Sequence, residues 1–270
     1  MNNPREIALE LLSDFGLSDL RSTDILDVIS ALDIPLKFKS LTGCDGRIIH
    51  GDNKSLIVIN ENIEFDTRIK FTVAHELGHY LMHRDSPIIH SDNISSMSWF
   101  NNKNKELIAQ QEYEANTFAS ELLLPTEIFK KEIQGIKFSP HLMKQLASKF
   151  GVSLSSMIYR FVEFGNQPIC AFYCRKNIVN YWKKSPLFTY QIKEVTKLSP
   201  PDDSVAAEYF EDGTIYIKEE AIQEITKSVW LVKRNKSDYA GADDFENDKF
   251  YEYCMVYSAV DLAISVIWED

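Results

Sequence analysis

The feature that most constrains this chain is the pentad His75-Glu76-Leu77-Gly78-His79. Its two histidines are four residues apart, so on an α-helix of 3.6 residues per turn their side chains project within about 40° of one another. Two imidazoles one turn apart can bind one zinc ion, and Glu76 follows the first of them, where a general base for an attacking water belongs. The pentad therefore predicts a helix that carries part of a catalytic zinc site, as in metallopeptidases.

The residues around the pentad favour a helix with one buried face. Apolar side chains recur at helical spacing and form one stripe, which consists of Ile69, Val73, Leu77, Tyr80 and Leu81. Both histidines lie on another face of the helix. Asp66 or Thr67 is the expected N-terminal cap. A glycine inside a helix costs about 1 kcal/mol relative to alanine. We therefore expect a second helix to come close to Ala74 and Gly78.

A catalytic zinc site needs a third protein ligand besides the two histidines and a water. His83 is nearest in sequence, but it lies about 12 Å from His75 along the axis, and three ligands in a line cannot form a tetrahedral face. The better source is a second predicted helix, Glu106–Leu124, which Pro125 ends.

Periodicity on the second helix chooses between two glutamates. Glu112 follows the inward, mainly apolar positions, whereas Glu114 follows the polar ones, which also include Gln110, Thr117 and Glu121. A carboxylate on an apolar stripe is costly unless it is paired or bound to metal, so Glu112 is predicted as the third ligand, with a buried ion pair as the alternative. Asn116, one turn later, is a candidate to accept the free ring N–H of a metal-bound histidine, or else an ordinary packing residue.

Two blocks of this sequence, Phe71–Tyr80 and Glu112–Pro125, resemble the ImmA/IrrE family of metallopeptidases in order and spacing. The similarity also takes in Ser55–Asn60 and Leu146–Ser153, and so covers roughly residues 5 to 165. It implies a gluzincin-like site in which His75, His79 and Glu112 bind Zn²⁺ and Glu76 is the general base. Family members typically cut helix-turn-helix repressors or anti-repressors in mobile-element, toxin–antitoxin or stress-response circuits. The resemblance thus implies a protein substrate in the same compartment, encoded nearby.

The expected fold class is α+β, in two domains. Residues 1–165 should form a helical, zincin-like peptidase domain with a small sheet. Its predicted helices are Pro4–Phe15 and Thr23–Leu32, and its predicted strands are Leu36–Phe38, Arg47–His50 and Ser55–Asn60. Residues 168–270 should form a mostly β C-terminal domain for substrate selection or regulation. Its expected strands are Ile169–Tyr173, Ile178–Trp182, Phe188–Ile192, Thr214–Lys218 and Val229–Val232, and Tyr251–Trp268 fits strands or a helix.

One predicted strand is also a candidate substrate site. In gluzincin-like sites an extended substrate can pair with a sheet edge along the cleft, through main-chain hydrogen bonds. The candidate edge consists of Leu56, Ile57, Val58, Ile59 and Asn60. An interior strand with no free edge is the alternative.

Composition excludes several other classes of protein. The net charge is −11, from 29 Lys and Arg against 40 Asp and Glu, which is the wrong sign for broad contact with nucleic acid. Apolar runs of bilayer length and a signal peptide are lacking, so we expect a cytoplasmic protein. The four cysteines include no Cys-x-x-Cys pair and are expected to be reduced thiols.

Three other functions remain open at this point. The first is a latent metal-binding sensor that does not cut, and the second is a metal-dependent hydrolase with a non-peptide substrate. The third is a DNA-binding regulator, because Leu142–Phe164 is spaced like a helix-turn-helix. Its would-be recognition helix, Leu154–Phe164, offers one arginine among apolar side chains, which favours packing over base recognition.

Overall fold

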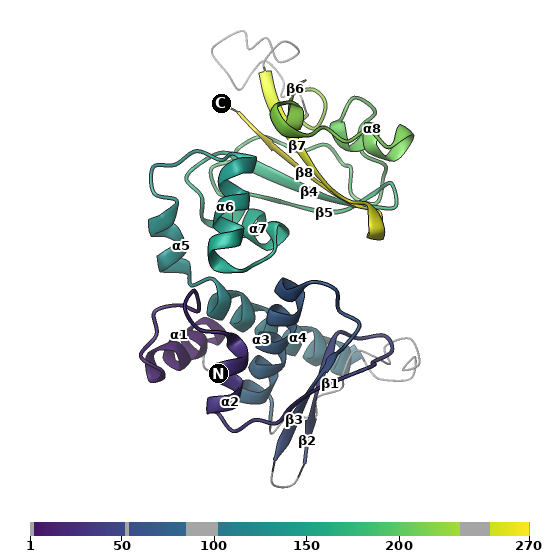
Figure 1. The fold of residues 1–270 in the computed structure, drawn as a ribbon. Coiled ribbons are helices and arrows are strands. Elements are labelled where there is room, and N and C mark those ends of the chain that lie inside the picture. The colour runs from purple at the N-terminus through teal and green to yellow at the C-terminus, as the bar shows by residue number, and fades with distance from the viewer. Residues whose placement is uncertain (1–2, 52–53, 85–101, 233–248, 270) are drawn as a thin grey trace. The chain divides into compact units, whose positions relative to one another are not determined.

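The computed structural model describes residues 3–51, 54–84, 102–232 and 249–269, and the chain divides into two compact units (Figure 1). The first unit comprises residues 1–132 and 146–153, and the second comprises residues 133–145 and 154–270. The fold is α+β, as predicted, with helices and two separate sheets. The functional division at residues 165–168 stays a prediction.

The sheet of the first unit has three strands, β1 (Leu36–Lys39), β2 (Gly46–His50) and β3 (Ser55–Asn60), as the sequence predicts to within one residue. Their order is β1-β3-β2, with β1 parallel and β2 antiparallel to β3. The expectation that Leu56–Asn60 forms a free edge is therefore wrong. Strand β3 is interior because its β-branched, buried residues have a paired strand on each side.

The described residues of the first unit also form the helices α1 (Pro4–Asp14), α2 (Ile25–Ala31), α3 (Asp66–Met82), α4 (Asn102–Leu123) and α5 (Thr126–Glu132). Side chains of Asn3 and Asp24 cap α1 and α2. The cap expected for α3 is wrong, because the helix already starts at Asp66 and its N-cap residue, Phe65, makes no side-chain cap hydrogen bond. Helix α4 begins four residues earlier than predicted.

Close packing of α3 against α4 is the feature that positions the site. A Cβ added to Gly78 would lie 3.0 Å from Cδ1 of Phe118 and 3.3 Å from Cα of Ala115. Around this contact Ala74, Ala115 and Phe118 are fully buried. The second helix expected beside Gly78 is thus α4, and the glycine permits an approach that a larger residue would obstruct.

One residue of the predicted polar face of α4 is not at the surface. Glu121 is 2% exposed, and its carboxylate accepts hydrogen bonds from the backbone N–H of Thr126 at 2.7 Å and from its hydroxyl at 2.6 Å. The prediction for Glu121 is wrong because the chain turns at Pro125 and the next helix starts over it. The carboxylate supplies acceptors at the beginning of α5.

The second unit is built on a five-stranded antiparallel sheet in the order β5-β4-β8-β7-β6 (Figure 1). The strands are β4 (Ile169–Arg175), β5 (Ile178–Lys184), β6 (Ile222–Thr226), β7 (Lys249–Tyr257) and β8 (Leu262–Trp268). Its helices are α7 (Leu154–Phe164) and α8 (Val205–Asp212), with short 3₁₀ turns η2 (Lys218–Ala221) and η3 (Ser258–Val260). Helix α6 (Pro140–Phe150) contributes residues to both units.

The predicted strands of this unit are only partly correct. Strands β4 and β5 are confirmed, and the ambiguous terminal stretch forms most of β7 and all of β8. Phe188–Ile192, Thr214–Lys218 and Val229–Val232 are not strands, apart from an isolated bridge between Ile192 and Leu231, while α8 and β6 went unpredicted. Phe188 and Trp230 lie in irregular segments, and their apolar side chains are buried in the core of the unit.

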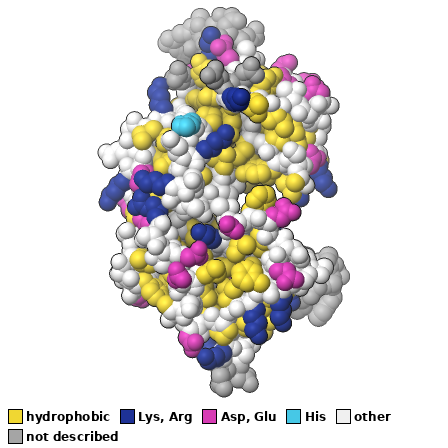
Figure 2. Space-filling view, in the orientation of Figure 1, with side chains coloured by type: hydrophobic (Ala, Val, Ile, Leu, Met, Phe, Trp, Pro, Cys, Tyr) yellow, Lys and Arg dark blue, Asp and Glu magenta, His cyan; other side chains and the backbone are white. Residues whose placement is uncertain are grey.

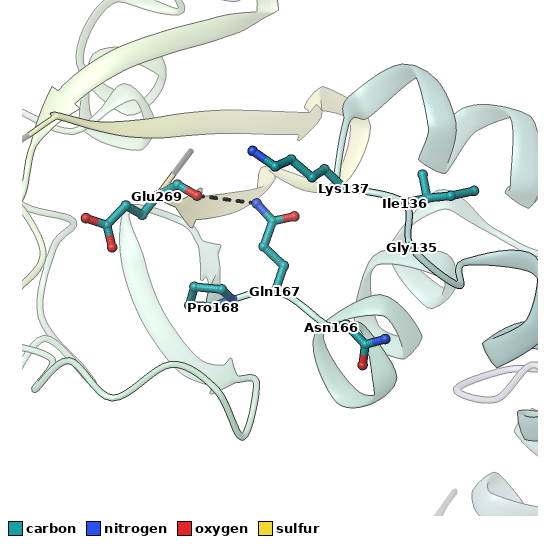
Figure 3. Close-up of a pocket in the computed structure, with 7 residues that line it drawn as sticks. All are labelled: Gly135, Ile136, Lys137, Asn166, Gln167, Pro168 and Glu269. Carbon is teal, nitrogen blue, oxygen red and sulfur yellow. Dashed lines mark hydrogen bonds between the residues drawn. The ribbon is translucent and has the colours of Figure 1, made fainter.

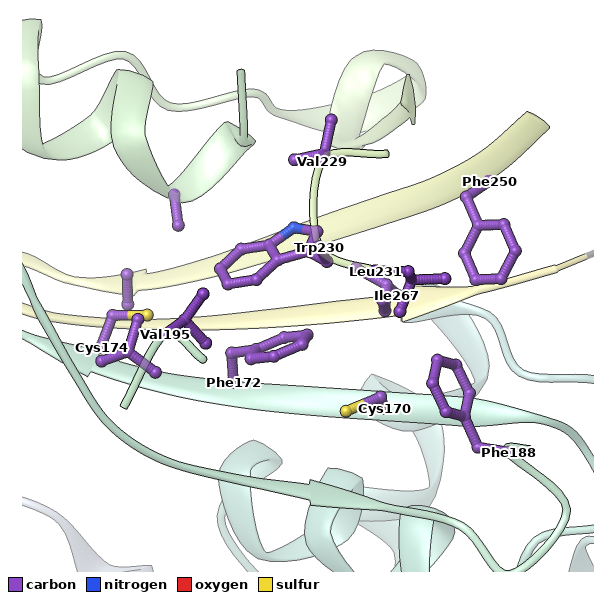
Figure 4. Close-up of a cluster of buried hydrophobic side chains, with 13 residues drawn as sticks. Cys170, Phe172, Cys174, Phe188, Val195, Val229, Trp230, Leu231, Phe250 and Ile267 are labelled. Carbon is purple, nitrogen blue, oxygen red and sulfur yellow. The ribbon is translucent and has the colours of Figure 1, made fainter. Parts of the chain in front are cut away.

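The core of the second unit surrounds Trp230, which stacks on Phe172 with ring centroids 3.9 Å apart (Figure 4). The indole N–H of Trp230 donates at 3.1 Å to Glu252, a carboxylate that is fully buried. Glu252 also accepts from the Ser265 hydroxyl and from the backbone N–H of Ala206 at the start of α8. These hydrogen bonds offset the cost of burying the carboxylate and join α8 to the sheet.

Gly78→Val tests the helix contact. The added methyl groups meet Phe118, so we expect the free energy of unfolding to fall by about 1–3 kcal/mol. Combining it with Phe118→Leu should give a favourable coupling free energy, because the smaller side chain frees space. Denaturant unfolding of the four proteins measures the coupling. A value of zero would contradict the close contact.

Candidate metal site

His75, His79 and Glu112 converge across the α3–α4 contact. Nε2 of His75 lies 3.0 Å from Nε2 of His79. The carboxylate oxygens of Glu112 lie 3.4 Å from Nε2 of His75 and 3.5 Å from Nε2 of His79. These three residues form a group whose ligand atoms all lie within 4.8 Å of one another. The sequence placed the same three residues together.

The donor set matches a tetrahedral zinc site. Zinc binds imidazole nitrogen and carboxylate oxygen at about 2.0–2.2 Å, so neighbouring ligand atoms of a tetrahedron lie about 3.4 Å apart. The separations of 3.0, 3.4 and 3.5 Å are close to that value. Two nitrogens and one oxygen also leave a fourth position for water or substrate, as catalytic rather than structural zinc sites do.

The electrostatics of the three residues suit a cation. Contacts with His75 and His79 hold the pKa of Glu112 well below its usual range, so its carboxylate is ionised. Burial lowers the pKa of His79, which favours the neutral imidazole that binds metal. Burial also opposes a charge on His75, but its contact with Glu112 and the charge of Glu76 raise the pKa of His75 overall. Without metal, His75 is thus more readily protonated than His79, because the negative charges of Glu112 and Glu76 favour its charged form.

Each histidine has a second partner on its other ring nitrogen. Nδ1 of His75 lies 3.0 Å from Oδ1 of Asn116, the contact that the sequence suggested, although its role remains a prediction. Nδ1 of His79 lies 2.9 Å from Nδ1 of His83, and Nε2 of His83 lies 2.8 Å from Oε2 of Glu114. The sequence pattern excluded His83 as a ligand and placed Glu114 on the polar face of its helix, and it did not predict that the two side chains meet. His83 follows His79 by four residues, a spacing that places two side chains next to each other on a helix, so their contact could have been predicted.

Glu76, the predicted general base, is buried on α3 and lies against strand β2. It is 4% exposed. A Cβ added to Gly46 of β2 would lie 3.2 Å from Cγ and Oε1 of Glu76, and 2.5 Å from Cγ2 of Thr72. Arg68 holds this end of β2 by donating from Nε and Nη2 to the carboxylate of Asp45. Only glycine at position 46 therefore allows β2 to pass this close to Glu76, and the sequence pattern did not predict this role for Gly46.

The strand next to the site is thus β2 rather than β3. Strand β2 pairs with β3 on one side only, so within the described sheet its other side is an edge. Ile49 on β2 is 49% exposed, whereas Ile57 and Ile59 on β3 are fully buried. The sheet edge beside Glu76 therefore belongs to β2 and not to Leu56–Asn60.

A separate hollow lies in the second unit (Figure 3). Gln167 at its centre is 7% exposed, accepts from the backbone N–H of Phe138 at 2.7 Å and donates to the backbone oxygen of Glu269 at 3.4 Å. Both ends of the amide are therefore used within the fold. The lining residues are Gly135, Ile136, Lys137, Asn166, Gln167, Pro168 and Glu269, none of which belongs to the metal-binding group.

Comparison with known proteins gives a consistent family assignment. Residues 29–162 match the IrrE N-terminal-like domain. Over 112 residues the chain is 32% identical to the metallopeptidase ImmA of Bacillus subtilis (strain 168). The aligned region covers 41% of this chain and 57% of that protein. The chain therefore spans little more than half the length of this relative.

A solved structure shares the fold of this chain at low sequence identity. It is described as a Mycobacterium tuberculosis transcriptional regulator and superimposes with a TM-score of 0.59 at 12% identity. The match covers 100% of this chain and 77% of the other. At this identity the likeness shows the fold alone.

Gly46→Ala tests the close approach of β2 to Thr72 and Glu76. The new methyl group collides with Thr72 and presses on Glu76, so we expect the free energy of unfolding to fall by about 1–3 kcal/mol. Thr72→Ser in the same chain removes the colliding methyl group and keeps the hydroxyl that donates to the Arg68 oxygen. This second change should restore most of the lost stability, as measured by denaturant unfolding. Equal stability of Gly46→Ala and wild type would contradict the close approach of β2.

Proposed function

Because residues 29–162 belong to the ImmA/IrrE family of metallopeptidases, we propose that this chain is a zinc-dependent endopeptidase. The observation that carries the proposal is the convergence of His75, His79 and Glu112 from two helices at separations that suit one tetrahedral ion. The family implies a metal, and Zn²⁺ is the choice that this nitrogen and oxygen set favours. Glu76, adjacent in sequence to the first ligand, completes the machinery.

The mechanism assigns each side chain one task. When bound, zinc lowers the pKa of a water and polarises the scissile carbonyl. His75, His79 and Glu112 would hold the ion, and Asn116 orients the His75 ring through its amide oxygen. Glu76 accepts the proton of the attacking water and passes it to the leaving amine. Its burial, at 4% exposure, shields this carboxylate from bulk water.

The proposed substrate is a cytoplasmic protein, specifically a helix-turn-helix repressor or anti-repressor encoded nearby. Strand β2 supports an extended peptide as the form that is cut, because a β-strand edge passes beside Glu76. Main-chain pairing with such an edge gives affinity with little dependence on sequence. Residues 1–165 are proposed as the peptidase domain, and residues 168–270 as the domain that selects substrate or regulates cleavage.

Direct binding to nucleic acid or membrane is not part of this proposal. On the face drawn in Figure 2, Lys and Arg side chains are interspersed with Asp and Glu, in keeping with the net charge of −11. Helices α6 and α7 do form the pair predicted at Leu142–Phe164, but Met157, Ile158 and Phe161 of α7 are fully buried. Among the residues that the structure describes, no helix has the length and apolarity needed to cross a bilayer.

Glu76→Gln tests the assignment of the base. The amide keeps the shape of the side chain but cannot accept the proton, so we expect kcat to fall by about 10²–10⁴ while zinc binds normally. Glu64→Gln, which changes an exposed carboxylate ahead of α3, is the matched control and should leave kcat unchanged. Zinc content by elemental analysis and cleavage of a protein substrate are measured together. Full cleavage by Glu76→Gln would overturn the role of this residue.

The choice of substrate is tested with the proteins encoded next to this chain. Each is incubated with the zinc-loaded protein, with and without a chelator, and cleavage is followed by mass spectrometry. We expect one helix-turn-helix protein to be cut, with loss of cleavage on chelation and recovery on adding zinc. Zinc binding without cleavage of any of them would favour a latent metal-binding sensor instead. Salt-dependent binding to duplex DNA would favour the regulator alternative.

A further inference from the structure

His83 is a buried polar side chain that the proposed mechanism does not use. It lies where α3 ends, one turn after His79, and is 4% exposed. Its Nδ1 lies 2.9 Å from Nδ1 of His79, and its Nε2 lies 2.8 Å from Oε2 of Glu114 on α4. Gln110 donates from Nε2 to the other oxygen of Glu114 at 2.9 Å. The result is a line of hydrogen bonds from α4 through His83 to a proposed metal ligand.

The kinds of atoms in this line determine where its protons lie. A carboxylate only accepts hydrogen bonds, so Nε2 of His83 donates to Glu114. With that proton in place, Nδ1 of a neutral His83 carries a lone pair and accepts from the N–H on Nδ1 of His79. Nε2 of His79 is then left with a lone pair, and this nitrogen is the one that lies near His75 and Glu112. The line of contacts therefore selects the tautomer that binds metal.

We propose that His83, oriented by Glu114, is a positioning residue that holds His79 in the tautomer and ring orientation needed for metal binding. The inference rests on the proposed zinc site, because only a metal gives this tautomer its use. His75 has a different arrangement, in which the amide oxygen of Asn116 faces its Nδ1. The two histidine ligands are thus held by different partners, a neutral amide and a histidine–carboxylate pair.

Burial makes the histidine–carboxylate pair the stronger of the two restraints. The side chains of His79, His83 and Glu114 are 2%, 5% and 19% exposed, so water competes little for their hydrogen bonds. An ionised carboxylate at the end of the line also increases the basicity of the ligand nitrogen. Removing such an outer partner of a metal ligand typically weakens metal binding by about 10–100-fold. We expect a loss of that size when the line is cut at His83.

Two variants of His83 separate positioning from packing. His83→Phe retains a ring of similar shape but no hydrogen-bonding atom, so we expect the Kd for zinc to rise by about 10–100-fold. His83→Asn can place an amide oxygen near the former Nδ1. We expect its Kd for zinc to rise by less than half as much as that of His83→Phe, on a logarithmic scale. His141→Phe, at an exposed histidine of α6, is the matched control and should bind zinc like wild type. Competition with a chromogenic chelator gives the Kd values.

A second readout does not need metal. In ¹⁵N-histidine-labelled, metal-free protein, the ring nitrogen shifts should report His79 as the Nδ1–H tautomer in wild type and His83→Asn. They should report loss of that single tautomer in His83→Phe. Unchanged zinc affinity and an unchanged His79 tautomer in a folded His83→Phe would overturn the inference. If wild type binds no zinc, the proposed function fails, while the tautomer measurement still decides whether His83 positions His79.

Discussion

The close approach of α3 and α4 is the constraint on which the rest of the site depends. Glu112 reaches the two histidines of α3 only because its helix packs directly on theirs, at Gly78 against Phe118 and Ala115. Burial of the surrounding apolar side chains stabilises this contact and so contributes to the site. Without metal, the carboxylate and the imidazoles stabilise each other's charged forms. The pKa of Glu112 is therefore lowered and the pKa of His75 is raised.

A layer of further contacts fixes the groups that would meet metal and substrate. Asn116 of α4 faces the outer nitrogen of His75, and His83, at the end of α3 and in contact with Glu114 of α4, faces the outer nitrogen of His79. Helix α4 thus brings Glu112 and Asn116 to the two histidines and Glu114 to His83. On the other side, Gly46 lets β2 pass beside Glu76. The site is therefore assembled from α3, α4 and β2, all of which belong to the first unit.

The sequence was most informative where a periodic pattern and a chemical requirement coincided. The spacing of His75 and His79 and the position of Glu112 on an apolar stripe were enough to bring the three residues together, and Gly78 pointed to the helix contact. The order of strands could not be derived, because β3 has the same apolar character whether it is interior or at an edge, so the edge was assigned to the wrong strand. Phe188 and Trp230 were read as strand residues, although burial in a core does not require a strand. His83 and Glu114 were missed because their partnership depends on the rotation of two helices about each other.

The central claim is that three side chains from two helices bind one zinc ion. It is tested most directly by a crystal structure of the zinc-loaded protein with anomalous scattering measured on both sides of the zinc absorption edge. We expect one strong anomalous peak, about 2.0–2.2 Å from Nε2 of His75, Nε2 of His79 and a carboxylate oxygen of Glu112. A peak bound by other residues, or the carboxylate of Glu112 turned away from an ion held by the two histidines, would contradict it.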